Sequence, residues 1–133
     1  MRSFPLEIVT PDGLEFSGNA ESILLRTTEG DVELLASHAD FLAALGIGRA
    51  RIIIDGQSKL ASLAGGFVLV KSGKVQVVAT TFEFADDIDL ARAEAAKARA
   101  EEQIRAAKDT RDHKLAEARL KRALNRINVK TAK

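Results

Sequence analysis

The sequence changes character near residue 85, and this change limits the folds open to the chain. All nine glycines, both prolines and all six phenylalanines lie before that residue. The segment after it lacks turn formers and large aromatic side chains, so it does not suit a second turn-rich β unit. Charge divides at nearly the same point: residues 1–89 hold 7 Lys and Arg against 13 Asp and Glu, net −6, whereas residues 90–133 hold 13 against 6, net +7. We expect an acidic body followed by a basic segment of different fold.

The first part predicts short strands separated by tight turns. Turn signals recur at short intervals, from Pro11-Asp12-Gly13 to Ser72-Gly73. Segments of strand length lie between them, and β-branched and aromatic residues are frequent in these segments. No stretch long enough for a helical crossover separates them, which favours antiparallel pairing. The expected fold class is β + α: an N-terminal antiparallel β-sandwich of about ten short strands over residues 1–85, followed by a C-terminal two-helix antiparallel hairpin over residues 86–133.

The last part predicts two helices. Asp86, Asp87 and Asp89 supply N-cap and first-turn carboxylates for a helix that runs to about Ala107. The segment KDTRD interrupts the pattern, and a second helix follows with leucines at helical spacing. The apolar face of the first helix is mostly alanine, so the two helices can approach closely but bury little apolar area. Burial stabilises by about 25 cal/mol per Å², so this contact is weak. The hairpin is expected either to pack as a plain appendage or to act as a movable element.

The sequence offers no catalytic motif. His38 and His113 are far apart and lack metal-ligand spacing. The segment GIGRAR places Arg51 where a dinucleotide fingerprint needs its third glycine, and no Walker loop is present. The serines match no nucleophile signature, and the absence of cysteine excludes thiolate chemistry and disulfides. We therefore expect that the chain is not an enzyme, requires no cofactor and has no metal site.

Arginines give the helical segment its basic faces. Arg92 and Arg99 share one face of the first predicted helix, and Arg119, Arg122 and Arg126 share one face of the second. If these faces meet, guanidinium groups converge, which is costly unless an anion lies between them. If the hairpin opens, a basic helix is offered to an acidic partner, while a solvated surface is an equal alternative for any single arginine. A nucleic-acid-binding module with a basic tail stays open as a second function, although the tail has no aromatic residue to stack on bases.

The whole chain resembles the epsilon subunit of bacterial F-type ATP synthases, the counterpart of the mitochondrial delta subunit. The stretches that carry the resemblance are, in order, VTPDGLEFSG, TTEGDVELLASHADFLAALGIGRARI, LAGGFVLV, KVQVVATT, DIDLARAEAAKARAEEQI and LKRALNRINV. The resemblance implies a non-catalytic subunit of the rotating central stalk. Its sandwich would bind the gamma subunit and the c-ring, and its helices would restrain ATP hydrolysis by the alpha and beta subunits.

The predicted location follows from the same resemblance and from the lack of targeting signals. The N-terminal stretch has no signal peptide, and no apolar run reaches the length of a membrane span. The chain is expected at the cytoplasmic face of the membrane, attached peripherally and only through the complex, with no nucleic acid among its partners.

The resemblance also implies two sets of binding residues. Asp31 and His38 would lie in the segment that faces the c-ring. The segment IDLARA matches the ATP-binding pattern of the family, which implies ATP as a regulatory ligand of the closed hairpin. Alanines would admit the base, carboxylates would accept hydrogen bonds from the base or ribose, and guanidinium groups would meet the phosphates. The residues implied for this site are Glu83, Ile88, Asp89, Arg92, Ala93, Arg99, Arg122 and Arg126.

The chain departs from the family pattern in the ring-facing loop and on one strand. Many relatives carry Pro-Gly before the histidine and proline two residues after it, whereas this chain has Ala36, Ser37 and Asp40. Relatives often carry Glu where Leu69 stands. These differences leave the expected fold unchanged and concern the shape of the loop and of the sandwich surface.

Overall fold

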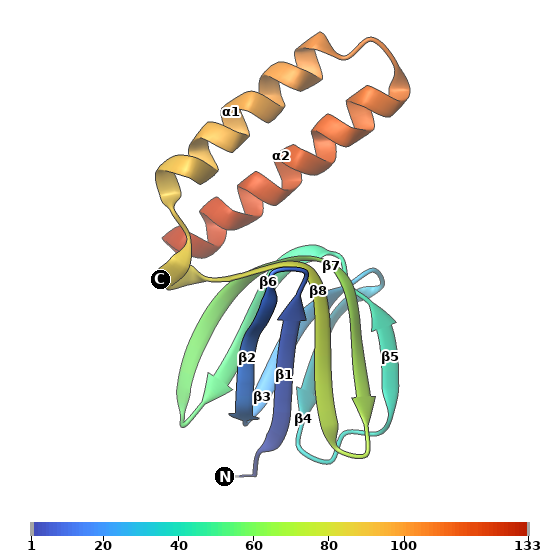
Figure 1. Cartoon of the computed structure of the whole chain (residues 1–133), viewed down its shortest axis with the longest axis vertical. Coiled ribbons are helices and arrows are strands. Elements are labelled where there is room, and N and C mark those ends of the chain that lie inside the picture. The colour runs from blue at the N-terminus through green and yellow to red at the C-terminus, as the bar shows by residue number, and fades with distance from the viewer. Residues whose placement is uncertain (1, 133) are drawn as a thin grey trace. The chain divides into compact units, whose positions relative to one another are not determined.

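Strands fill the first of two units in the computed structural model, which describes residues 2–132 (Figure 1). The units are Met1–Phe84 and Ala85–Lys133. The second unit holds a short 3-10 turn, η1 (Ala85–Asp87), and the helices α1 (Leu90–Ala106) and α2 (Thr110–Thr131). The strands described in the first unit are β1 (Phe4–Thr10), β2 (Gly13–Ala20), β3 (Ser22–Thr27), β4 (Gly30–Leu35), β5 (Phe41–Ala44), β6 (Ile47–Ile54), β7 (Gln57–Lys71) and β8 (Lys74–Phe84).

The strands form one hydrogen-bonded path that folds into two layers. Their order is β2-β1-β8-β7-β6-β3-β4, with β5 paired to β7. β7 pairs with β6 before residue 65 and with β5 after residue 66, and β8 pairs with β1 only through residues 75–78. β7 and β8 therefore serve both layers. We call the layer of β2, β1, β8, β7 and β5 the first layer, and that of β8, β7, β6, β3 and β4 the second.

The predicted fold class is confirmed, with two corrections to its detail. The expected ten short strands are eight continuous strands in the described residues, because two of them contribute a segment to each layer. β1 and β8 are parallel, whereas every other strand pair is antiparallel. Parallel strands need a long connection, which strands that are neighbours in sequence lack here. β1 and β8 are connected by all the other strands, so they can pair in parallel.

Two consecutive glycines allow β7 to pass between the layers. The backbone angle φ is +71° at Gly65 and +102° at Gly66, values that L side chains rarely adopt. A Cβ atom at Gly66 would lie 1.9 Å from the carbonyl oxygen of Val78 on β8. The pairing of β7 with β8 continues on both sides of this point. The glycines thus let β7 bend without losing its partner.

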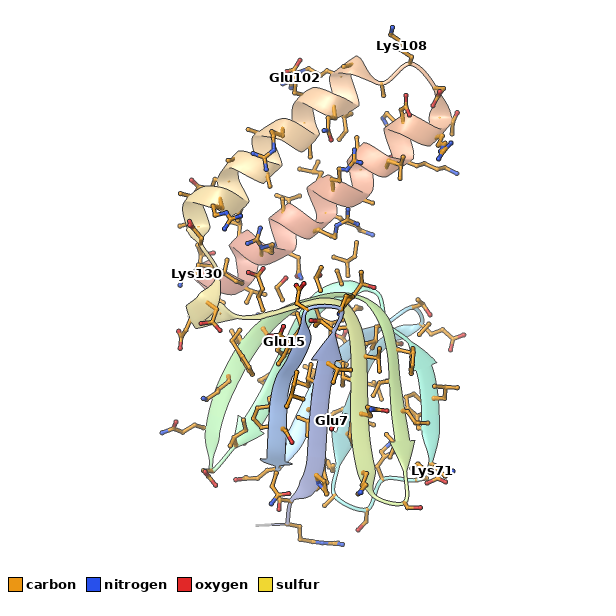
Figure 2. All side chains as sticks on the ribbon, in the orientation of Figure 1. Glu7, Glu15, Lys71, Glu102, Lys108 and Lys130 are labelled. Carbon is orange, nitrogen blue, oxygen red and sulfur yellow. The ribbon has the colours of Figure 1, made fainter. Side chains whose placement is uncertain are left out.

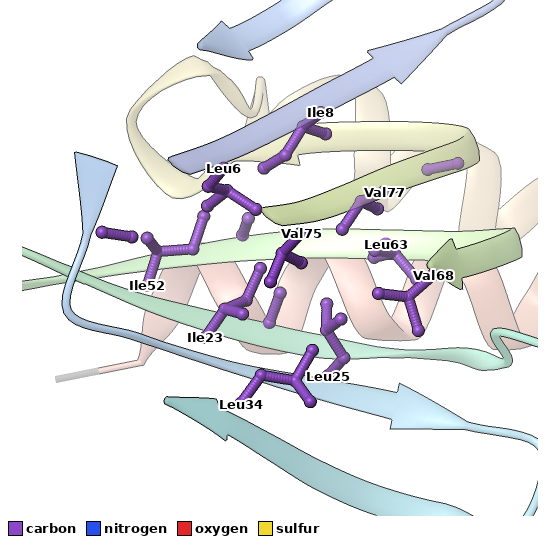
Figure 3. Close-up of a cluster of buried hydrophobic side chains, with 14 of the residues drawn as sticks. Leu6, Ile8, Ile23, Leu25, Leu34, Ile52, Leu63, Val68, Val75 and Val77 are labelled. Carbon is purple, nitrogen blue, oxygen red and sulfur yellow. The ribbon is translucent and has the colours of Figure 1, made fainter. Parts of the chain in front are cut away.

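An aliphatic core holds the two layers together. Inward positions alternate along the strands, as in β1, where Phe4, Leu6 and Ile8 are buried and the residues between them are exposed. Burial of each large side chain is worth about 1.5–3 kcal/mol, so the core stabilises this unit strongly. Figure 3 shows side chains of this core, among them Leu6, Ile8, Ile23, Leu25, Leu34, Ile52, Leu63, Val68, Val75 and Val77.

Aspartates cap both helices of the hairpin. Asp89 Oδ1 accepts a hydrogen bond from the backbone N–H three residues further on at 3.1 Å, and Asp109 Oδ1 does the same at 2.8 Å. The prediction for Asp89 as an N-cap is confirmed. Asp86 and Asp87 were expected beside it, but they lie in η1, because the chain leaves that turn and is extended at Asp89 before α1 begins.

Alanines lie at the buried positions of both helices. Ala93 and Ala100 are buried on α1, and Ala116 and Ala123 are buried on α2, with a spacing of two turns on each helix. The helices pack against each other in antiparallel directions (Figure 1). Small side chains allow this close approach but remove little apolar area from water. The hairpin therefore closes with much less apolar burial than the sandwich.

Substitution of Gly66 by alanine tests the passage between the layers. We expect Gly66→Ala to lower the free energy of unfolding by at least about 2 kcal/mol, because the new Cβ overlaps the Val78 carbonyl at a strained φ. Gly46→Ala is the control, since its Cβ would meet no atom closer than 3.5 Å. Urea unfolding of the full chain, followed by circular dichroism, measures both. Equal stability of the two variants would contradict this account of the bend.

Candidate functional site

Asp31 and His38 flank β4, an edge strand of the second layer. Asp31 is the second residue of β4, and His38 lies three residues beyond its end. A strand rises by about 3.3 Å per residue, so Asp31 is about 13 Å from the end of β4 at Leu35, beyond which His38 lies. They do not form one compact site. They mark the two ends of a surface that runs along the whole of β4.

Asp31 is held by an arginine on the neighbouring strand. The Arg26 Nε donates a hydrogen bond to Asp31 Oδ1 at 2.5 Å, and both side chains are about half exposed. This bond, together with attraction to Arg26 and Arg49, holds the pKa of Asp31 below its ordinary value. The Arg26 side chain lies across Gly48, where a Cβ would be 2.5 Å from that of Arg26. Gly48 thus leaves the room that the ion pair occupies.

His38 lies in the connection between β4 and β5. Its backbone N–H donates to the Leu35 carbonyl at 3.2 Å, and its Nδ1 lies 2.7 Å from the Ala39 carbonyl oxygen. The imidazole packs edge to face on Phe41, with ring centroids 5.8 Å apart. The ring is therefore fixed by contacts on both sides.

The two departures in this loop have structural counterparts. Ser37 adopts φ +65°, a conformation that favours glycine, and its hydroxyl accepts a hydrogen bond from the Arg2 guanidinium at 2.5 Å. Asp40 Oδ1 accepts the backbone N–H of Ser72, in the β7–β8 turn, at 3.0 Å. Side-chain hydrogen bonds of Ser37 and Asp40 thus hold this loop.

The outward face of the first layer carries exposed apolar side chains. Leu42 on β5 is 67% exposed and Phe67 on β7 is 43% exposed. Leu42 pairs with Leu69, Phe67 pairs with Val78, and Val78 pairs with Val9, so these side chains share one face. We call these five residues the outer patch. Contiguous exposed apolar surface of this kind marks interaction sites in soluble proteins.

A groove of about 630 Å³ adjoins the outer patch on the same layer. It is lined by the start of β1, the end of β2 and the β7–β8 turn, and Leu69 belongs to both features. The groove also holds polar groups, including Glu7, whose Oε1 accepts a hydrogen bond from Gln76 Nε2 at 2.9 Å. Figure 2 shows Glu7 on β1 and Lys71 near the end of β7. Patch and groove together offer an apolar centre with a polar margin, which is the composition of a protein-binding face.

Contacts within the hairpin fix how its two antiparallel helices are aligned along their axes. The Lys130 Nζ donates a hydrogen bond to the Ala85 carbonyl oxygen at 3.1 Å, which joins the end of α2 to η1. The buried alanines fit the same antiparallel alignment, with Ala93 level with Ala123. Arg119 Nη1 donates to Gln103 Oε1 at 3.2 Å, which bridges the helices nearer their connection.

This alignment brings three of the predicted arginines to one level. Arg92 on α1 lies between the levels of Arg122 and Arg126 on α2. Arg99 lies seven residues further along α1, about 10 Å away. Among residues 2–132, the guanidinium groups of Arg92, Arg99 and Arg122 form no salt bridge. Arg92 and Arg122 are thus two cations without a salt bridge at neighbouring levels of the helix pair, and like charges that lie close together attract an anion.

The residues predicted around the base have varied surroundings. Ile88 is 3% exposed and Ala93 has no exposed surface, so a base that contacts Ala93 requires a local opening of the structure. One oxygen of Asp89 accepts the capping hydrogen bond of α1. Glu83 is half-buried at the end of β8, in the sandwich unit.

Two of these features escaped the sequence analysis. The role of Gly48 depends on an arginine from a different strand, which no local pattern reveals. The outer patch did leave a signal, since the segment FVLV is apolar at all four positions, as in strands that are covered on both faces. Of the described residues, no group of three or more His, Asp or Glu side chains could hold a metal ion. None of the described helices is long and apolar enough to span a bilayer.

Comparison with known proteins agrees with this two-part structure. Residues 3–85 match the family described as ATP synthase, Delta/Epsilon chain, beta-sandwich domain, and residues 86–131 match its long alpha-helix domain. The chain is 40% identical to the ATP synthase epsilon chain of Ruminococcus albus, over 100% of both chains. It is also 40% identical to the epsilon chain of Bacillus velezensis, over 97% of this chain and 98% of that relative.

Solved structures share the fold at lower identity. A chain of the Euglena gracilis mitochondrial ATP synthase structure matches with a TM-score of 0.77 and 21% identity, over 90% of this chain and 76% of that one. A chain of the Tetrahymena thermophila mitochondrial ATP synthase structure, solved as central stalk and c-ring, matches with a TM-score of 0.64 and 15% identity, over 98% of both.

The two matched domains and the full-length relatives define a class, that of two-domain subunits of the ATP synthase. The chain belongs to the ATP synthase delta/epsilon chain family. The resemblance to bacterial epsilon subunits is thereby confirmed. A subunit of this family is non-catalytic, so the chain is not an enzyme in itself.

Replacement of Arg26 by glutamine tests the ion pair at Asp31. We expect Arg26→Gln to raise the pKa of Asp31 towards its ordinary value of 3.8, because the main hydrogen bond to the carboxylate is lost. A lowered carboxyl pKa stabilises the fold above the unfolded-state pKa, and this gain is lost as pH falls through the folded-state value. The pair is half exposed, so the variant should lose no more than about 1 kcal/mol at neutral pH.

Carboxyl-detected NMR titration of the full chain measures the Asp31 pKa. Arg51→Gln is the matched control, since Arg51 contacts Glu33 instead, at 3.5 Å. An unchanged Asp31 pKa in Arg26→Gln, or the same change in the control, would contradict the assignment.

Proposed function

We propose that the chain is a rotor subunit that joins the central stalk of an F-type ATP synthase to the c-ring and regulates ATP hydrolysis through its two helices. Family membership supports the first part of this proposal. The Tetrahymena structure that shares the fold was solved as central stalk and c-ring, and the Euglena structure also contains the c-ring. The partners are then the gamma subunit, the c-ring and the alpha and beta subunits, at the cytoplasmic face of the membrane.

The observation that carries the docking role is the outer patch with its adjoining groove. The patch residues Leu42 and Phe67 are exposed although they are large and apolar, so a partner that covers them gains burial free energy. We assign this face of the first layer to the gamma subunit. The ion-paired edge along β4, with Asp31 and His38 at its ends, is chemically different, and we assign it to the c-ring. Two surfaces of one rigid sandwich can thus hold two partners.

The hairpin supports a regulatory role because little apolar burial holds it closed. Arg92 and Arg122 form no salt bridge among the described residues, so their repulsion opposes closure, and an anion that binds them favours it. ATP supplies a triphosphate for the guanidinium groups and a planar base for a slot between small side chains. ATP shifts the equilibrium only by its higher affinity for the closed hairpin. Its role here is that of a ligand and not of a substrate.

In the open form the helices would act on the catalytic subunits. Residues 90–133 carry a net charge of +7, and the basic face of α2 suits acidic loops of the beta subunit. The same charge was the basis for the alternative of a nucleic-acid-binding module. Membership in the ATP synthase family favours the rotor function over that alternative.

A single exposed leucine tests the docking role. We expect Leu42→Asp to weaken binding of the full chain to the gamma subunit at least about thirtyfold, because it places a charge on the most exposed residue of the outer patch. Leu35→Asp is the control, since Leu35 is also exposed, at 52%, but lies on β4 in the second layer. Surface plasmon resonance on immobilised gamma subunit measures both. The proposal fails if Leu42→Asp binds like the unmodified chain or if both variants lose affinity equally.

Arginine variants test the ATP site. Arg92→Ala and Arg126→Ala should each weaken ATP binding by at least about 1.5 kcal/mol, the scale of a charge-assisted hydrogen bond. Arg105→Ala serves as the control, because Arg105 pairs with Glu102 near the other end of α1. Calorimetric titration of the full chain gives the affinities. Unchanged ATP affinity in both Arg92→Ala and Arg126→Ala would rule out the site.

A further inference from the structure

The two helices of the hairpin can separate at only one of their ends. α1 ends at Ala106 and α2 begins at Thr110, so residues 107–109 hold the helices together there. The ends that can part are the start of α1 and the end of α2. The end of α2 that carries Lys130 lies beside η1, the short turn that precedes α1 (Figure 2). Contacts at this end therefore set how easily the hairpin opens.

A lysine near the end of α2 binds the backbone of η1. The Lys130 Nζ donates a hydrogen bond to the Ala85 carbonyl oxygen at 3.1 Å, in partly buried surroundings. The same oxygen accepts the backbone N–H of Ile88 at 3.2 Å. A carbonyl oxygen can accept two hydrogen bonds, so the lysine adds to the turn without breaking it. Within residues 2–132 Lys130 forms no salt bridge, and its ammonium group is held at this carbonyl.

The same end of the hairpin unit buries side chains larger than alanine. Ile88 is 3% exposed and Val129 is 1% exposed, whereas the other buried residues described in this unit are alanines. Val129 directly precedes Lys130, and Ile88 shares the Ala85 carbonyl with it. A buried Val or Ile removes more apolar area from water than a buried alanine does. Apolar stabilisation is therefore concentrated at the end that must part when the hairpin opens. We call Ala85, Ile88, Val129 and Lys130 the clasp.

We propose that the clasp keeps the hairpin closed and that its release opens the hairpin from this end. The inference rests on the proposed function, in which the open hairpin is the form that acts on the catalytic subunits. The hydrogen bond from Lys130 to Ala85 exists only in the closed form, so its free energy acts wholly on the balance between closed and open hairpin. The clasp needs no nucleotide, so it and ATP favour closure independently.

Native-state hydrogen exchange of the full chain without nucleotide tests the clasp. We expect Lys130→Met, which removes the donor but keeps a long side chain, to speed exchange of the α1 and α2 amides about fivefold. Lys130→Arg keeps a donor and the charge, so it should restore most of the protection. Lys121→Met is the matched control, because Lys121 is an exposed lysine of the same helix, and it should exchange like the unmodified chain.

Val129→Ala tests the apolar part of the clasp. We expect it to speed exchange of the same amides about tenfold, because two buried methyl groups are lost. Alanine favours helix more than valine does, so an effect on helix propensity alone would act in the opposite direction. Amides of β1, β7 and β8 should be unchanged in every variant, which excludes a general loss of stability.

The location of the faster exchange separates the clasp from fraying of a helix end. A positive charge near a helix C-terminus stabilises the last turn, so its loss alone would affect only the amides of residues 128–131. The clasp predicts that the amides of residues 94–97, at the start of α1, change together with them. Faster exchange confined to residues 128–131 would overturn the inference. So would equal exchange in Lys130→Met and Lys121→Met, or exchange in Lys130→Arg as fast as in Lys130→Met.

Repeating the exchange with saturating ATP separates this inference from the proposed function. If the clasp variants behave as expected but ATP slows helix exchange in none of the samples, regulation by ATP fails and the clasp stands. If ATP slows helix exchange while Lys130→Met and Val129→Ala both match the Lys121→Met control, the clasp is overturned and the proposed function stands. We expect ATP to slow helix exchange in the unmodified chain and in Lys130→Met alike, which would support both.

Discussion

The bend of β7 at Gly65 and Gly66 is the constraint on which the sandwich depends. It lets β7 and β8 contribute to both layers, so the two sheets are joined through continuous strands as well as through their core. The segment of β7 after the bend pairs with β5 and turns Phe67 and Leu69 outward, which creates the outer patch. The segment before the bend pairs with β6, which continues the second layer through β3 to β4 at its edge. This bend thus allows one strand to contribute to both layers and to the outer patch.

The hairpin differs from the sandwich in the size of its buried side chains. Its buried positions are mostly alanine, whereas the sandwich buries large aliphatic side chains such as Leu25 and Ile52. Because stability follows buried apolar area, the two units should differ widely in the free energy needed to open them. This difference suits a subunit in which one part is a fixed attachment and the other responds to a ligand. The arginines of the hairpin are the reason for proposing an anion as that ligand.

The general architecture could be predicted because its signals are local. Turn residues, strand alternation and the alanine-rich helices each depend on neighbours in sequence, and they gave a sandwich followed by a hairpin. The parallel pairing of β1 with β8 could not be predicted, since it joins the first and last strands. The ion pair of Arg26 and Asp31 was hidden for a similar reason, because its geometry requires Gly48 on a third strand. Ser37 and Asp40 were recognised as unusual, but their hydrogen bonds appear only in three dimensions.

Native-state hydrogen exchange of the full chain, with and without saturating ATP, tests the central claim that a stable docking platform carries a weakly closed, ligand-controlled hairpin. The account predicts that amides of α1 and α2 exchange through an opening that costs far less free energy than exposure of the amides of β1, β7 and β8. It predicts also that ATP slows exchange in the helices and leaves these strands unchanged. Equal opening free energies for helices and strands, or an equal effect of ATP on both, would contradict it.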